Sequence, residues 1–153
     1  MLGRKTEAVD VYQRVIARHP ENAGAYLNLG ADLYSLGRYG DSLTNLVHAQ
    51  KIDPKNPMIA LNIGNAHKAI GKIEAALTAY ELALSLEPNY ADAWSNRGDA
   101  LCLLGRSEEA VTSYEKALAI NPAFPDALNN LGLTHIEAKR FDAGIAALTR
   151  AIE

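Results

Sequence analysis

Residues 91–124 read ADAWSNRGDALCLLGRSEEAVTSYEKALAINPAF, and variants of this stretch recur along the chain of 153 residues. The recurrence is clearest in the prolines, whose numbers rise in steps of 34 at Pro20, Pro54, Pro88 and Pro122. Glycines keep the same step at Gly30, Gly64, Gly98 and Gly132. One bulky column consists of Tyr12, Leu46, Tyr80, Tyr114 and Leu148, and another of Leu29, Ile63, Arg97 and Leu131. A period shared by several columns predicts stacked repeats with one continuous core.

Each repeat divides into two segments with the apolar spacing of an amphipathic helix. The first helices are predicted near residues 24–36, 58–70, 92–104 and 126–138. The second helices are predicted near residues 39–52, 73–86, 107–120 and 141–153, with one more near 5–18. The turn between them is expected to hold a left-handed glycine at Gly37, Gly71 and Gly105. Lys139 occupies the equivalent position in the last repeat, where we expect a steric cost because lysine has a Cβ atom.

Three features of the repeat have a direct physical reading. The prolines should end the second helices, because proline cannot continue the hydrogen-bond ladder. Gly98 and its equivalents fall inside the first helices, where glycine costs about 1 kcal/mol relative to alanine. A cost repeated in every repeat indicates that the two helices of a hairpin approach closely there. Arg97 interrupts an apolar column, and we expect its charge to reach past the core to an acidic neighbour.

The segments Ala91–Ala100 and Tyr114–Leu118 resemble tetratricopeptide repeats, and the resemblance extends over essentially the whole chain. It implies an all-α fold, an α-solenoid of antiparallel helix pairs wound into a right-handed superhelix with nine helices and about four and a half repeats. Residues 1–22 would be the second helix of a truncated repeat. Complete repeats are expected at 23–56, 57–90 and 91–124, and a repeat lacking its end at 125–153.

The composition and charge of the chain argue against several classes of function. The chain is 48% hydrophobic and 22% charged, with a formal net charge of -3 and scattered basic residues, which argues against nucleic acid as the main partner. No apolar run reaches the length of about 20 residues that spans a bilayer, so membrane insertion is not expected. The start of the chain lacks the apolar stretch of a secretory signal, which favours a cytoplasmic location.

Catalytic and metal-binding motifs are missing from the sequence, and we predict neither enzymatic activity nor a cofactor. His67 and His135 share a column but lie two repeats apart, so they are expected to pack between helices rather than bind one metal. Cys102 is the single cysteine, which excludes an internal disulfide. We expect it to be half-buried and close to the groove, without a histidine to activate it.

The tetratricopeptide resemblance implies that the first helices line a concave groove that holds a peptide. In these helices an asparagine recurs at the step of the repeat, at Asn28, Asn62, Asn96 and Asn130. An amide offers both a donor and an acceptor, so such a row can pair with the backbone of an extended chain. The row resembles the asparagine ladder in the tetratricopeptide superhelix of O-linked N-acetylglucosamine transferase. The alternative is that asparagine is simply common in this column.

Helical spacing adds neighbours to this ladder. Tyr34, Asn65 and Lys68 should lie beside the first two asparagines. The aspartates Asp92, Asp99 and Asp126 should surround the last two, which would favour a basic ligand segment near the C-terminal repeats. Alternatively, these acids form an ordinary solvated face. The dicarboxylate clamp known in the family needs basic residues to hold carboxylates. This clamp is absent here, because the matching positions hold Leu27, Met58, Leu61, Asp92 and Asn96.

The leading functional prediction is therefore a scaffold for protein–protein interaction that binds an extended peptide segment in its groove. A second possibility is the substrate-recruiting arm of a larger glycosyltransferase-like enzyme. A third is a self-associating structural module, a homo-oligomer formed through the ends of the array. These ends are expected to need covering, because the chain starts and stops inside repeats.

Overall fold

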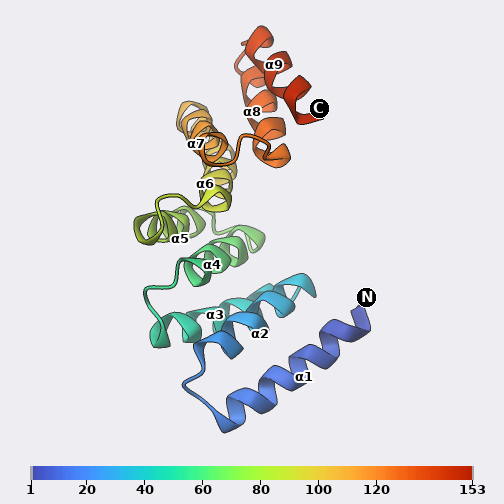
Figure 1. Ribbon diagram of the computed structural model, residues 1–153, viewed down its shortest axis with the longest axis vertical. Helices are drawn as coiled ribbons and strands as arrows, with labels where there is room; N and C mark the ends of the chain where they lie inside the picture. Colours follow the sequence, from blue (N-terminus) through green and yellow to red (C-terminus); the bar gives the residue numbers. More distant parts are fainter. Residues whose placement is uncertain (1, 153) are drawn as a thin grey trace. The chain divides into compact units, whose positions relative to one another are not determined.

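The computed structural model describes residues 2–152, and the side chains of residues 6–152. The described residues form nine α-helices and no strand (Figure 1). The first helices of the repeats are α2 (Ala23–Ser35), α4 (Pro57–Ala69), α6 (Ala91–Leu103) and α8 (Pro125–Glu137). The second helices are α1 (Leu2–Arg18), α3 (Tyr39–Ile52), α5 (Ile73–Leu86), α7 (Ser107–Ile120) and α9 (Phe141–Ile152).

These bounds confirm the predicted helices within a residue, except at the start of α1. The first helices begin and end one residue earlier than predicted, and α1 begins at Leu2 rather than near residue 5. Residue 153, the predicted end of the last helix, lies outside the described residues. Each proline at the end of a repeat follows its second helix by two residues, as Pro88 follows Leu86.

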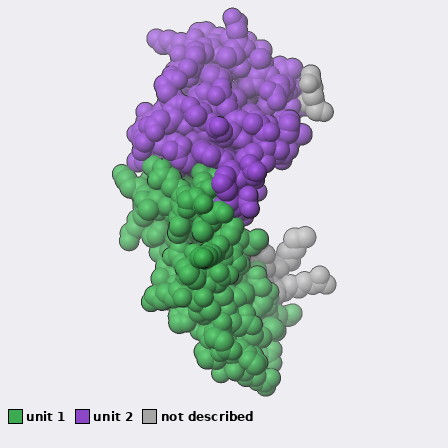
Figure 2. Space-filling model, turned by 60° about the vertical axis from the view of Figure 1, so that its left-hand side comes forward, with its two compact units in different colours: residues 1–86 green, residues 87–153 purple. Residues whose placement is uncertain are grey.

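The chain divides into two compact units, residues 1–86 with α1–α5 and residues 87–153 with α6–α9 (Figure 2). Within each unit every helix packs on the next one along the chain. The first helices of neighbouring repeats also touch, α2 with α4 in the first unit and α6 with α8 in the second. Each unit is therefore a short α-solenoid in which the first helices lie together.

The glycines inside the first helices mark the closest approach of each hairpin. A Cβ atom placed on Gly98 would lie 2.5 Å from Cε1 of Tyr114, and one placed on Gly30 would lie 2.6 Å from Cγ of Leu46. Gly64 meets Tyr80 and Gly132 meets Leu148 in the same way. The glycine column and the bulky column therefore form one repeated contact, which confirms the predicted close approach.

The turns between paired helices confirm the expected left-handed position. Gly105 has a φ of 72°, and its equivalent Lys139 has a φ of 60°. The amide of Arg140, which follows this turn, donates to the carbonyl of His135 at 2.8 Å, as the amide of Arg106 does to Leu101 at 2.9 Å. Lys139 thus adopts the conformation of a turn glycine, at a steric cost of about 1–2 kcal/mol.

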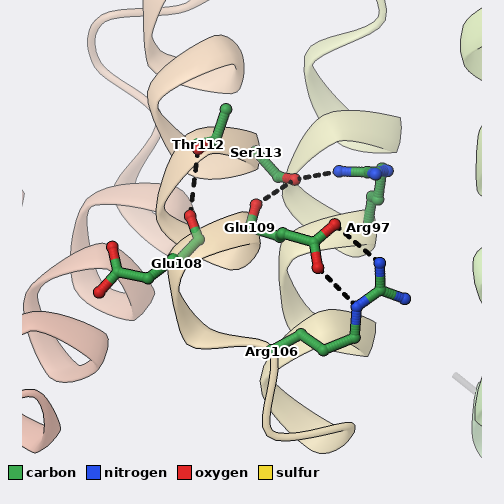
Figure 3. A network of polar contacts seen from close by, with 6 residues as sticks. All are labelled: Arg97, Arg106, Glu108, Glu109, Thr112 and Ser113. Carbon is green, nitrogen blue, oxygen red and sulfur yellow. Dashed lines mark hydrogen bonds and ion pairs between the residues drawn. The ribbon is translucent and has the colours of Figure 1, made fainter.

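Arg97 is half-buried among polar partners of its own repeat (Figure 3). Its Nη1 donates to the hydroxyl of Ser113 at 2.7 Å, and that hydroxyl donates to the backbone carbonyl of Glu109 at 2.9 Å. The guanidinium also lies 5.8 Å from the ring centre of Trp94. The expected acidic neighbour is Glu109: hydrogen bonding to Arg106 and the nearby charges of Arg106 and Arg97 lower the pKa of its carboxyl group.

Candidate functional site

A cavity of about 220 Å³ lies between α6 and α8 of the second unit. Five of the predicted peptide-binding residues line it, together with Ser95 and Phe124: Asp92, Asn96, Asp99, Asp126 and Asn130. Asp92 and Asp126 are exposed, and the other three are half-buried. The structure therefore brings together the predicted residues of the second unit.

Helical geometry explains this convergence. Asp92, Asn96 and Asp99 are spaced four and then three residues apart, which places them on one face of α6. Asp126 and Asn130 occupy the equivalent positions one repeat later, on α8. Because α6 and α8 pack side by side, the two stripes face a common space. Asp92 and Asp126 also lie in the first turns of their helices, where a carboxylate complements the helix dipole.

One carboxylate of the cavity is held by the two neighbouring helices. The hydroxyl of Tyr114 on α7 donates to Oδ1 of Asp99 at 3.0 Å, and Nδ2 of Asn130 on α8 donates to the same oxygen at 2.9 Å. Burial, followed by the nearby Asp99 charge, raises the pKa of Tyr114 well above its usual value, so this phenol stays protonated and donates.

Cys102 is half-buried, as predicted. Its Sγ lies 3.6 Å from the Tyr114 hydroxyl and 3.4 Å from Oγ1 of Thr134. The hydroxyl of Thr134 in turn donates to the backbone carbonyl of Asn130 at 2.7 Å. Asp99 and Asn130 of the cavity thus belong to a connected polar network from three helices.

The predicted residues of the first unit have different surroundings. Asn28 on α2 is exposed, and Nδ2 of Asn62 on α4 donates to the carbonyl of Met58 at 2.9 Å. Oδ1 of Asn65 accepts a hydrogen bond of 2.9 Å from the Tyr80 hydroxyl, the same contact as in the Tyr114–Asp99 pair one repeat later. Asn65 and Asp99 are therefore structural partners of tyrosines as well as predicted neighbours of the asparagine ladder.

Tyr34 and Lys68, the other two predicted residues, are half-buried. Tyr34 packs against the apolar core of the first unit, and burial, with a smaller contribution from Tyr39, raises the pKa of its hydroxyl. A cavity of about 320 Å³ in this unit lies between α1, α2 and α3 and is lined by residues outside the prediction, among them Gln13 and Arg38. The structure does not gather the predicted residues of the first unit around that cavity.

Sequence reasoning missed the aromatic wall of the α6–α8 cavity. Phe124 precedes α8 at its N-cap, and Tyr90 holds the equivalent position before α6. In the first unit this column contains Asn22 and Asn56, whose side chains accept hydrogen bonds from the first turns of α2 and α4. The change from capping asparagine to aromatic residue along one column was the signal that could have identified it.

The cavity between α6 and α8 is lined mainly by polar groups. Its side chains are carboxylates, amides, a hydroxyl and a phenyl ring, without a histidine or cysteine. Within the described residues, no cluster of three or more His, Cys, Asp or Glu is arranged to hold a metal ion. His67 and His135 are half-buried with buried Nδ1 atoms, and burial, then the charge of Lys72, lowers the pKa of His67. None of the described helices is long and apolar enough to cross a membrane.

Comparison with known proteins places the chain in a family. A family model described as TPR repeat matches residues 64–105 and 98–139, and one described as Tetratricopeptide repeat matches residues 2–57. A comparison with curated proteins found no match.

Solved structures of similar fold cover nearly the whole chain. MamA is 26% identical, with a TM-score of 0.89 over 98% of this chain and 88% of that chain. TTC0263, a thermophilic TPR protein in Thermus thermophilus, is 24% identical, with a TM-score of 0.83 over 99% of this chain and 83% of that chain. YrrB, described as a TPR protein with an unusual peptide-binding site, is 20% identical, with a TM-score of 0.79 over 98% and 77%.

Repeat matches across both units, the 34-residue period and the glycine contact inside each hairpin agree with one another. Proteins of this kind generally act as non-enzymatic scaffolds with protein partners. The chain belongs to the tetratricopeptide repeat family, and it is an all-α repeat protein that serves as a protein–protein interaction module.

Proposed function

We propose that the chain binds an extended peptide segment of a partner protein along its first helices, with the cavity between α6 and α8 as one binding site. The observation that supports this most directly is the convergence of Asp92, Asn96, Asp99, Asp126 and Asn130 on one cavity. Asparagine amides at the spacing of the repeat suit the regular donors and acceptors of a peptide backbone.

The expected affinity is modest. A net hydrogen bond contributes about 1 kcal/mol, and binding must offset the ordering of the peptide. A few such bonds from the asparagines leave a dissociation constant of about micromolar or weaker. Selectivity would then come from the side chains that surround the asparagines.

A peptide-display selection followed by fluorescence titration tests this proposal. Peptides selected on the intact chain should lose most of their affinity for an Asn96→Ala, Asp126→Ala double variant, which removes one amide and one carboxylate from the cavity. The matched control is a Thr112→Ala, Glu115→Ala double variant on the exposed side of α7. Equal binding of the selected peptides by both variants, with both folded by circular dichroism, would contradict the proposed site.

Self-association is a second candidate function, favoured by the exposed face of α9. Ile145 is 60% exposed and Ile152 is 87% exposed. Their equivalents one repeat earlier, Val111 and Leu118 on α7, are only 7% and 8% exposed, in a helix that packs against α8. The helix face that is buried on α7 is therefore apolar and exposed at the equivalent positions of α9. A second copy of the chain could cover this exposed face.

Light scattering at several concentrations tests self-association. We expect the average mass to rise with concentration, and an Ile145→Glu, Ile152→Glu variant to remain monomeric. Leu103→Glu, on the 64% exposed Leu103 of α6, serves as the control. A constant monomer mass for the unmodified chain at every concentration would rule this function out.

A further inference from the structure

We propose that the cavity between α6 and α8 selects a Lys or Arg side chain of the bound peptide, and that Tyr114, outside the cavity, is a positioning residue for this selection. The inference deepens the proposed function and rests on it. It depends on the orientation of two groups in the cavity, the Asp99 carboxylate and the Asn130 amide.

The Asp99 carboxylate has a fixed orientation because its Oδ1 receives hydrogen bonds from two helices. Tyr114 donates at 3.0 Å and Asn130 at 2.9 Å. The Tyr114 side chain is 1% exposed, and its ring lies against Gly98, where a Cβ atom would be only 2.5 Å from Cε1. The phenol therefore has little freedom to move, and Asp99 is held by a rigid donor of the hairpin.

Asp99 in turn fixes the orientation of the Asn130 amide. One N–H of Nδ2 of Asn130 donates to Asp99, which leaves Oδ1 and the second N–H for other partners. The Oδ1 atom receives one long contact of 3.4 Å from Nδ2 of Asn129. An amide oxygen can accept two hydrogen bonds, so Asn130 offers a cationic ligand an acceptor in a fixed orientation.

Two further carboxylates of the cavity act only as acceptors, whereas Ser95 and Asn96 can both donate and accept. Asp92 and Asp126 are exposed carboxylates from two helices, and an ionised carboxylate only accepts hydrogen bonds. Phe124 adds an aromatic surface that suits a flat guanidinium or an aliphatic stem. A lining rich in acceptors, with negative charge and one aromatic wall, fits a cationic side chain with several N–H donors.

The first unit provides an internal control for the tyrosine. Tyr80 donates to Oδ1 of Asn65 at 2.9 Å, so the same hydrogen bond there ends on a neutral amide. Loss of the Tyr80 hydroxyl removes a comparable bond and leaves the α6–α8 cavity intact. In the outermost hairpins the equivalent pairs are Ala31 with Leu46 and Leu133 with Leu148, which have no polar counterpart.

Fluorescence titration with two labelled Gly/Ser-based peptides tests the inference. The peptides are identical except that one contains arginine and the other citrulline, its neutral analogue of similar shape. The intact chain should bind the arginine peptide about tenfold more tightly, the ratio expected for a hydrogen bond to a charged group. Asp99→Asn should lower this ratio most, because only Asp92 and Asp126 then remain as carboxylates of the cavity, and Tyr114→Phe should lower it by a smaller factor. Tyr80→Phe should leave it unchanged.

The ratio of the affinities for the arginine and citrulline peptides reports the positioning role of Tyr114. Thermal unfolding of the same variants measures general destabilisation separately. An equal ratio in Tyr114→Phe and the intact chain would overturn the role of Tyr114. Binding of both peptides with equal affinity by the intact chain would overturn the cation selection and leave the proposed peptide site standing. Failure of the proposed function would appear separately, as display-selected peptides that bind the cavity double variant and its control equally.

Discussion

The hydroxyl of Tyr114 donates a hydrogen bond of 3.0 Å to Oδ1 of Asp99, and this pair joins the inside of a hairpin to the wall of a cavity. The contact links packing and binding, because the ring of Tyr114 fills the space over Gly98 while its hydroxyl orients a groove residue.

Stability should fall at alkaline pH because of Tyr114. Burial first, and then the Asp99 charge, raise the pKa of this phenol in the folded chain. The unfolded chain releases the proton near pH 10, whereas the folded chain retains it, so the unfolded state is stabilised relative to the folded state as pH rises beyond about 10. Urea denaturation at several pH values should show this slope, and Tyr114→Phe should lessen it. Identical slopes in the two proteins would refute the assignment.

Gly98→Ala should destabilise the second unit. The added methyl group would overlap the ring of Tyr114, and overpacking of this kind costs about 1–3 kcal/mol. Chemical denaturation measures the loss. Gly40→Ala is the matched control: it lies in α3 with no atom within 4 Å of the added Cβ, and should be neutral or slightly stabilising. Equal stability of the two variants would contradict the packing argument.

Lys139→Gly should stabilise the last hairpin by about 0.5–1 kcal/mol. Lys139 is the one described residue other than glycine with a positive φ, and glycine adopts this conformation without the steric cost. Thermal unfolding should show a higher midpoint. The reverse change, Gly105→Lys, should lower it at the equivalent turn, and a lower midpoint for Lys139→Gly would show that the turn is not strained.

Ala143→Glu should add an ion pair to the last repeat. Nε and Nη2 of Arg106 donate to the two carboxylate oxygens of Glu109, each at 2.7 Å. Arg140 is equivalent to Arg106, and its Nη1 pairs with Glu108 at 3.0 Å, but its Nε and Nη2 are buried without a partner. Ala143 stands where Glu109 would be. We expect a gain of up to about 1 kcal/mol in the free energy of unfolding at low salt. Ala143→Gln is the control, and an equal gain from it would exclude a charge effect.

The sequence was sufficient to predict the helices and the hairpin contact because both follow from the period. The glycine column predicted that the two helices of each hairpin approach closely, and the structure shows that the bulky column lies opposite it, with Tyr114 over Gly98. The shift of one residue at the start of α2 agrees with capping, because Asn22 accepts a hydrogen bond from the amide of Ala25 at 2.9 Å. The helices α6 and α8 begin equally early without a capping side chain, so capping does not explain the shift in every repeat.

The hydrogen bonds of the site were not predictable in the same way. Columns indicate which residues share a helix face, and that was enough to group Asp99 with Asn130. They do not specify that Asp99 accepts from both Tyr114 and Asn130, because that depends on distances between three helices. The same limit applies to Asn65, whose partner Tyr80 lies on the following helix.

The contact between each internal glycine and its bulky partner also bears on how the protein forms. Gly98 and Tyr114 are close in the sequence, so a hairpin can assemble from a short stretch without waiting for distant segments. We therefore expect folding to begin in more than one place and to spread between adjacent repeats, and thermal fluctuations to open single hairpins while the rest of their unit persists.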